Sequence, residues 1–251
     1  MEKLMSVITQ AVNIPLPEGG TMNGHLARPD SDEKLPGVLV FMEIFGINDH
    51  IRSVTEKLAG EGFVAMAPDY FHRTGPGIEL NYDEAGMAEG MTHLGQLQAD
   101  QMISDAQTAK DFLEARGDIS GGGVGAIGFC IGGHMAYLAA CEIGLKAAAS
   151  YYGGGIAAPA GPGGGPSTLS RTKNISGRIE CYFGEKDAMI PQDQVEAIRD
   201  ALESTGTSHG IHVYGEADHG FNCDQRDSFN AASAQDAWGR SISLFRAELL
   251  D

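Results

Sequence analysis

The sequence predicts one α/β domain, in which a mostly parallel central sheet is covered by helices on both faces. Short apolar runs typical of buried strands alternate along the chain with segments of helical period. The length of 251 residues fits one such domain, and no internal repeat or long Pro- or Ser-rich linker divides residues 1–251. Hydrophobic residues make up 42% of the chain, which is enough for a packed core.

The expected elements follow one another in the order of a parallel sheet. The first apolar run, residues 37–41, is followed by Asn48 as a helix N-cap and by a helix that ends near Gly60. The other expected strands are residues 63–67, 124–129, 147–152, 179–183 and 211–214. The other expected helices are residues 83–115 (broken near Gly95), 131–141, 192–202 and a last helix with Trp238, Ile242, Phe245 and Leu249 on one face. The Gly- and Pro-rich residues 153–170 interrupt this alternation and are expected to form a surface loop.

Charge and composition exclude several classes of partner. The formal net charge is -17, so the surface repels phosphate backbones and anionic membranes, and we expect neither nucleic-acid nor membrane binding. Residues 1–10 lack the apolar core of a secretory signal, and the most apolar stretch, residues 37–47, contains Glu43 and is too short to span a bilayer. The four cysteines show no metal-ligand spacing and are expected to be free thiols in a cytoplasmic protein without a metal or cofactor. The sequence leaves open a monomer or a small homo-oligomer.

A candidate nucleophile, Cys130, stands where a strand is followed by a helix. Residues 128–133 (GFCIGG) have the G-x-nucleophile-x-G form of a nucleophile elbow, with cysteine in place of the more usual serine. The helix N-terminus directs its dipole at the thiol, which favours the thiolate, and the backbone N–H of Ile131 is one expected oxyanion donor. The alternative is a buried small hydrophobe, and we accept that interpretation for Cys141 and Cys181.

A histidine base is expected after the nucleophile and after an acid. The histidines that follow Cys130 are His134, His209, His212 and His219. We expect His219 to be the base, because it follows a strand on the loop at the C-terminal end, where active sites of open parallel sheets gather. His134 lies one turn past the cysteine on a buried helix and is expected to be structural.

The expected acid is Asp187, which follows the strand that ends at residue 183. Glu185 is also available, and Asp193 lies already in the next helix. Asp187 would hold the imidazole tautomer and stabilise the imidazolium. The alternative is a helix-capping or loop carboxylate, since such residues are common in these turns.

With these residues in hand, the chain resembles the dienelactone hydrolase (carboxymethylenebutenolidase) family of the α/β-hydrolase superfamily. The resemblance runs from about Leu35 to the last helix, and it is specific because its motifs occur together and in order. The motifs are residues 42–48 (MEIFGIN), 68–73 (PDYFHR), 128–133 (GFCIGG), 152–155 (YGGG), 184–187 (GEKD) and 219–221 (HGF). The resemblance implies an α/β-hydrolase fold and cleavage of an ester or lactone through an acyl-thioester.

The resemblance also implies roles for individual residues. The implied residues are Cys130, Asp187 and His219 as the triad, and Ile44 and Ile131 as backbone donors of the oxyanion hole. It further implies that Glu43 lies near the resting thiol and takes part in forming the thiolate when substrate binds. From the residues alone, Glu43 is only an acidic residue at a strand end, which is usually solvated.

A cationic site for a substrate carboxylate is the least complete part of the resemblance. Arg73 matches the position where characterised members hold that carboxylate, and a surface charge or a structural ion pair is the alternative. A second arginine of the family is replaced here by Cys223, four residues after the histidine. The sequence leaves open whether Arg226, three residues further on, reaches the pocket.

Two function classes remain from the sequence. The first is an enzyme that acts on a small-molecule ester or lactone, with a general carboxylesterase or thioesterase as the nearest alternative to dienelactone hydrolase chemistry. The second is a non-catalytic binding protein of the same fold, because a fold by itself does not fix a function.

Overall fold

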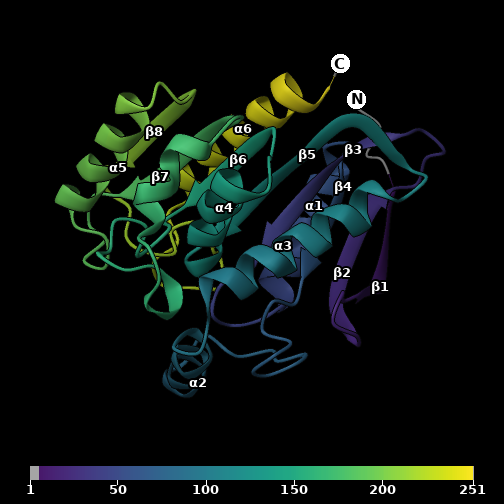
Figure 1. Cartoon of the computed structure of the whole chain (residues 1–251), viewed down its shortest axis with the longest axis horizontal. Coiled ribbons are helices and arrows are strands. Elements are labelled where there is room, and N and C mark those ends of the chain that lie inside the picture. The colour runs from purple at the N-terminus through teal and green to yellow at the C-terminus, as the bar shows by residue number, and fades with distance from the viewer. Residues whose placement is uncertain (1–5, 251) are drawn as a thin grey trace.

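The computed structural model describes residues 6–250, and Figure 1 shows one twisted sheet with helices packed against it. The elements are β1 (Val7–Pro15), β2 (Thr21–Pro29), β3 (Leu35–Phe41), α1 (Asp49–Gly60), β4 (Val64–Pro68), α2 (Glu84–Leu94), α3 (Ala99–Glu114), β5 (Ile119–Phe129), α4 (Ile131–Glu142), β6 (Ala147–Tyr151), η1 (Pro162–Gly164), η2 (Thr168–Asn174), β7 (Arg178–Gly184), α5 (Gln192–Ser204), β8 (His209–Tyr214) and α6 (Ala231–Leu249). The strand order of the sheet is β1-β2-β4-β3-β5-β6-β7-β8. No helix of the described chain is long and apolar enough to cross a membrane.

The expected mostly parallel sheet is confirmed. The six strands from β3 to β8 run parallel to one another. The N-cap expected at Asn48 is present, since its side chain accepts a hydrogen bond from the backbone N–H of Ile51. The helical region expected to break near Gly95 does so, because α2 ends at Leu94 and α3 begins at Ala99.

The structure adds a hairpin that the sequence analysis did not identify. Strands β1 and β2 pair antiparallel, and β2 also pairs antiparallel with β4. The turn between β1 and β2 contains Gly19 and Gly20 at φ 96° and 84°, a conformation that favours glycine. β1 is largely exposed and β2 only partly buried, so neither has the continuous apolar run that identifies the buried strands.

Helices cover both faces of the sheet, and two glycines show which helix lies on which face. Gly37 of β3 pairs in register with Val124 of β5, so Gly37 and Gly125 point to opposite faces. A Cβ at Gly37 would meet Leu113 of α3 at 3.0 Å, and one at Gly125 would meet Phe245 of α6 at 3.0 Å. In Figure 1, α3 and α4 accordingly lie in front of the sheet and α6 behind it.

The segment expected to be a surface loop is partly built into the core. Residues 153–170 contain η1 and the start of η2, and Thr168 is 1% exposed. The hydroxyl of Thr168 lies 2.7 Å from Nε2 of His134, and Nδ1 of His134 lies 2.8 Å from the carbonyl of Gly154. Both ring nitrogens of His134 are therefore occupied, which supports the structural role expected for this histidine. The Gly- and Pro-rich composition predicted only a loop. The contacts with His134 join residues 20 and 34 positions apart, so composition could not indicate them.

The turn between β5 and α4 requires glycine at its neighbours. A Cβ at Gly132 would collide with the carbonyl oxygens of Phe41 and Met42, which end β3, and a Cβ at Gly128 would collide with the carbonyl oxygen of Gly132. The first turn of α4 therefore lies directly against the end of β3. This close approach brings the β3–α1 and β5–α4 loops together at the carboxyl edge of the sheet.

We expect Gly132→Ala to lower the free energy of unfolding by about 1–3 kcal/mol, because backbone atoms of two segments would have to separate. Gly239→Ala is the matched control: Gly239 lies inside α6 and no atom stands within 4 Å of an added Cβ. That control should raise stability by about 0.4–1 kcal/mol through loss of chain entropy in the unfolded state. Urea unfolding followed by circular dichroism measures both, and equal effects of the two variants would contradict the close approach.

Candidate active site

Cys130 occupies a strained turn between β5 and α4. Its backbone has φ 57° and ψ -121°, a region that non-glycine residues rarely adopt. The turn is held from both sides, since the N–H of Cys130 donates to the carbonyl of Tyr151 at 3.1 Å and its carbonyl accepts from the N–H of Gly133 at 2.9 Å. The side chain is half-buried and stands at the N-terminus of α4, where the helix dipole favours negative charge. These are the local conditions expected of a nucleophile elbow.

His219 and Asp187 form a buried pair at the ends of neighbouring strands. Nδ1 of His219 lies 2.8 Å from Oδ2 of Asp187, and the two residues are 7% and 3% exposed. The other oxygen of Asp187 accepts from the N–H of Met189 at 2.8 Å, which fixes the carboxylate. The alternatives Glu185 and Asp193 are both exposed. The acid and the base expected from the sequence therefore lie in contact, with Asp187 as the acid.

The charge of His219 is set by its neighbours. Burial by itself lowers the pKa of His219, but the hydrogen bond to Asp187 and the approach of Cys130 outweigh it and raise that pKa to about 10. Apart from its approach to Cys130, Nε2 has no hydrogen-bond partner among the described residues. At neutral pH the arrangement thus supports an imidazolium beside the thiol group, a charge distribution that favours the thiolate.

The two residues expected to form the oxyanion hole lie on adjacent loops. Ile131 is the first residue of α4, so its N–H has no partner inside the helix. Ile44 follows β3, and among the described residues its N–H donates to no protein acceptor. Because the end of β3 abuts Gly132, both donors lie near the Cys130 turn. Their joint use as an oxyanion hole remains a prediction.

Glu43 is buried beside the site and is bound by two side chains. It is 1% exposed; its Oε2 accepts from the hydroxyl of Tyr82 at 3.0 Å, and its Oε1 lies 3.3 Å from Nη1 of Arg226. Glu43 is therefore not a solvated carboxylate at a strand end. Arg226 also stacks over the rings of Phe45 and Tyr82, at 5.8 and 5.7 Å from their centroids.

Arg226 therefore reaches the site, which the sequence left open. Cys223 lies behind it, fully buried, and burial together with nearby Glu43 raises the pKa of the Cys223 thiol to about 11. A thiol in that environment stays protonated and unreactive at neutral pH. Cys141 and Cys181 are buried as well, as expected, and burial raises the pKa of each.

Arg73 lies elsewhere. Its Nη2 pairs with Oδ1 of Asp105 at 2.7 Å and with Oε1 of Glu18 at 2.6 Å. It lines neither of the cavities that contact His219. Arg73 therefore forms the structural ion pair that was the alternative to substrate binding, and Arg226 is the guanidinium beside the site. The motif match could not show this, because Asp105 comes from α3, which is distant in the sequence.

One buried group brings together side chains that bind metals in other proteins. The potential ligand atoms of Glu43, His50 and Cys223 lie within 4.8 Å of one another. The sequence analysis found no metal-ligand spacing because these residues come from three separate segments. The guanidinium of Arg226 beside Glu43 already supplies the compensating positive charge, which opposes a cation at the same place.

Two cavities adjoin the catalytic pair. One of about 410 Å³ contacts His219 and contains the charged residues Asp218, Arg226 and Asp227 beside apolar side chains such as Phe45 and Met87. The other, also of about 410 Å³, contacts Cys130 and His219 and is lined mainly by apolar residues and glycines. The site thus has a polar side and an apolar side, and both are of a size that binds small molecules.

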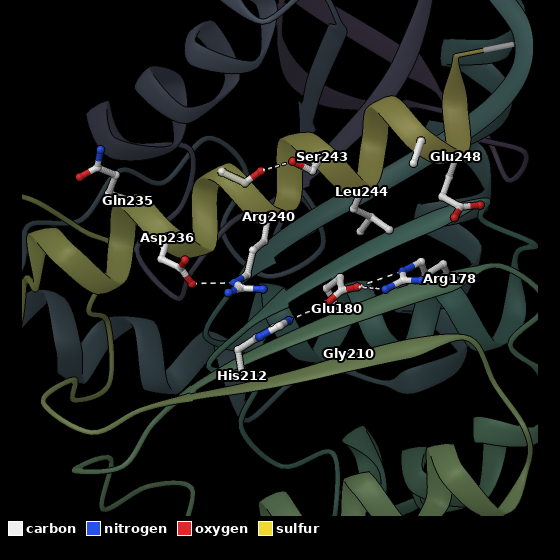
Figure 2. A pocket seen from close by; sticks show the side chains of 12 residues that line it. Arg178, Glu180, Gly210, His212, Gln235, Asp236, Arg240, Ser243, Leu244 and Glu248 are labelled. Carbon is white, nitrogen blue, oxygen red and sulfur yellow. Dashed lines mark hydrogen bonds and ion pairs between the residues drawn. The ribbon is translucent and has the colours of Figure 1, made fainter.

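A larger cavity lies away from this site, between β7, β8 and α6 (Figure 2). It measures about 740 Å³, and most of its charged side chains pair with one another. Glu180 contacts Arg178 and His212 at 2.7 Å, and Arg240 contacts Asp236 at 2.6 Å. The cavity holds no candidate nucleophile, so size alone does not identify the active site.

Three residues of the site received no role in the sequence analysis, although two of them, Tyr152 and Arg226, were named there. Tyr82 and Arg226 bind Glu43, and the ring of Tyr152 packs edge-on against His219 at 5.2 Å. Tyr152 has φ 36°, and among the described residues its buried hydroxyl has no hydrogen-bond partner. The 152–155 motif contained Tyr152 and is a signal for it. No sequence signal indicated Tyr82.

Replacing Asp187 by Asn should lower kcat about 10³–10⁴-fold without unfolding the protein, because His219 loses its tautomer and its counter-charge. The pKa of His219 should fall from about 10, since burial then acts without the carboxylate. Steady-state kinetics and an NMR titration of His219 measure the two effects. Asp193→Asn, at an exposed acid in the first turn of α5, is the control and should change neither.

The same pair has a consequence for stability. Because the folded-state pKa of His219 is raised above its ordinary value of 6.5, the pair stabilises fully below pH 6.5 and loses this effect as the pH rises through about 10. The difference in unfolding free energy between wild type and Asp187→Asn should therefore narrow across that range. A constant difference would contradict the raised pKa.

Comparisons with known proteins agree with this geometry. Residues 22–249 match the model of the "Dienelactone hydrolase family". A Synechocystis protein named "Putative carboxymethylenebutenolidase" is 41% identical over 226 residues, which cover 90% of this chain and 92% of that protein. An Escherichia coli K12 protein of the same name is 34% identical over 251 residues, covering 96% and 88%.

A solved structure extends the likeness to three dimensions. The crystal structure of a "Putative Dienelactone Hydrolase" from Klebsiella pneumoniae superposes with a TM-score of 0.85 at 32% identity, covering 96% of this chain and 98% of that one. With the fold, the elbow and the family match in agreement, the chain belongs to the dienelactone hydrolase family of α/β-fold hydrolases.

Proposed function

We propose that this member of the dienelactone hydrolase family cleaves its ester or lactone bond with Cys130 as nucleophile, His219 as acid and base, and Asp187 as the orienting carboxylate. The observation that carries the proposal is the buried His219–Asp187 pair, 2.8 Å apart, beside a cysteine held in a strained elbow. Strain, burial and a shifted pKa occur together at functional sites.

The first half of the reaction forms an acyl-enzyme. The Cys130 thiolate attacks the acyl carbon, and the resulting oxyanion accepts hydrogen bonds from the N–H groups of Ile44 and Ile131. The tetrahedral intermediate collapses as the bond to the alcohol oxygen breaks. The His219 imidazolium donates its Nε2 proton to that oxygen, so the alcohol leaves neutral and an acyl-thioester remains.

The second half releases the acid. His219 is now neutral and takes a proton from water, and the water oxygen attacks the thioester carbonyl. The second tetrahedral intermediate expels the Cys130 thiolate and leaves the carboxylic acid. The imidazolium and thiolate of the resting site are restored, so no external proton donor or cofactor enters the balance.

Glu43 and Arg226 link the chemistry to the charge of the substrate. The guanidinium of Arg226 is already paired with Glu43 and lines the polar cavity. A substrate carboxylate that binds Arg226 therefore competes with Glu43. Substrate binding would thus free Glu43 from Arg226 beside the site, which agrees with the role that the family resemblance implies for Glu43.

A second candidate is a general carboxylesterase or thioesterase that acts on neutral substrates. It is favoured by the state of the two arginines, because Arg73 is held by two carboxylates and Arg226 by one. Neither guanidinium is free for a substrate carboxylate in the absence of a rearrangement. The two candidates share the catalytic residues and differ only in what is recognised.

We expect wild type to hydrolyse both a dienelactone and a neutral aryl ester, and Cys130→Ala to lose about 10⁴-fold or more of kcat on each, because no thiolate remains. Cys141→Ala, at a buried thiol away from the site, is the matched control and should keep both activities. Steady-state kinetics measure the rates, and mass spectrometry of quenched reactions should show the acyl adduct on Cys130.

The outcomes separate the candidates. Cleavage of the neutral ester alone would keep the catalytic residues and reject the dienelactone as a substrate. Full activity in Cys130→Ala would mean that another group is the nucleophile. Binding of ester by wild type without turnover would favour the non-catalytic protein.

A further inference from the structure

The two cavities beside the catalytic pair lie on different sides of the reacting bond. Both contact His219 and Met189, so they meet at the pair and are divided by the Met189 side chain, which is 62% exposed. Only the apolar cavity contacts Cys130 and Ile131, and only the polar cavity contacts Arg226. The two cavities therefore offer different surroundings to the two parts of a substrate.

The apolar cavity is built from two segments that close over the elbow. Leu94 and Leu97 come from the junction of α2 and α3, and Ala158, Ala160 and Pro162 come from the Gly- and Pro-rich segment. Five of the lining residues are glycines, whose missing side chains leave the space open. Figure 1 shows α2, which leads into this junction, standing apart from the other helices.

The apolar cavity has no group that would hold an anion. Its lining contains no Lys, Arg, Asp or Glu. Its ionisable groups besides the catalytic ones are limited to His134, whose two nitrogens are hydrogen-bonded and whose burial lowers its pKa to about 4. The polar cavity, by contrast, contains Asp218, Arg226 and Asp227.

The reaction assigns a substrate part to each side. In the acyl-enzyme the acyl group is bonded to Sγ of Cys130 with its oxygen toward the N–H of Ile131, so it stays in the cavity that these residues line. The alcohol takes its proton from His219 and leaves through the cavity that contacts His219 but not Cys130.

From this geometry we infer that the enzyme is selective for esters of an apolar carboxylic acid with a polar alcohol, and that the cavity lined by Leu94, Leu97 and Ala158 is the acyl site. The inference rests on the proposed function, since it takes Cys130 as the nucleophile. A small lactone that carries a carboxylate would leave this cavity largely empty.

The first experiment compares p-nitrophenyl acetate with p-nitrophenyl hexanoate, which share a leaving group and differ in the acyl chain. We expect kcat/KM to rise about three- to fourfold for each added methylene, as apolar burial predicts. Ala158→Phe fills the acyl site and should lower kcat/KM for the hexanoate by about tenfold or more while changing that for the acetate less than about twofold. Ala160→Phe is a second variant of the same cavity with the same expected effect. Ala160 is exposed, so the substitution should not disturb the core.

Ala188→Phe is the matched control, because Ala188 lines only the polar cavity. It should leave the hexanoate-to-acetate ratio within about twofold of the wild-type value. A ratio near one in wild type, or loss of the preference in Ala188→Phe and not in the two acyl-site variants, would overturn the inference. Those results would leave the proposed function intact if Cys130→Ala were still inactive. Activity of Cys130→Ala on either ester would instead reject the proposed function.

Discussion

The close approach of the first turn of α4 to the end of β3 is the constraint on which the rest of the site depends. No Cβ fits at Gly132, because the carbonyl oxygens of Phe41 and Met42 occupy its place. The same contact lies two residues from Cys130, whose φ is 57°, and sets the β3–α1 loop beside the elbow. The strained turn at Cys130 and the neighbouring N–H groups of Ile44 and Ile131 therefore both depend on this packing contact. Strain of this kind persists only where the surrounding structure fixes it, and here β3, β5 and β6 all do so.

The site keeps its buried charges in pairs. His219 is paired with Asp187, and Glu43 is paired with Arg226, so each of these four groups has a partner of opposite charge. Burying a charge without such a partner is costly, because the charge loses its hydration and gains nothing in return. Because Glu43 neutralises the charge of Arg226, the guanidinium can bind a substrate anion only if that anion displaces Glu43. The overall charge of -17 makes this local arrangement more important, because the wider field repels anions.

The polar and apolar sides of the site have different structural origins. The proposed catalytic residues follow the ends of β5, β7 and β8, which the sheet holds in fixed register. The walls of the acyl site come from the α2–α3 junction and the Gly- and Pro-rich segment, which lie outside the sheet. This division lets one catalytic apparatus act on different acids as the walls change, in accord with the rule that function resides in sites carried by a fold.

Much of the fold and of the triad follows from the sequence by itself. The elbow is local, since its glycines and cysteine are adjacent in the chain, and the parallel sheet follows from apolar runs separated by helices. The contact between Asp187 and His219 could be expected because each residue lies on the loop that follows a predicted strand. The N-terminal hairpin did not follow, because half-exposed strands lack a continuous apolar signal. The pairing of Glu43 with Arg226 and Tyr82, the capture of Arg73 by Asp105 and the shape of the acyl site were decided only by tertiary structure. Each of these joins residues separated by dozens to hundreds of positions, and a single sequence carries no record of which distant side chains will share a buried volume.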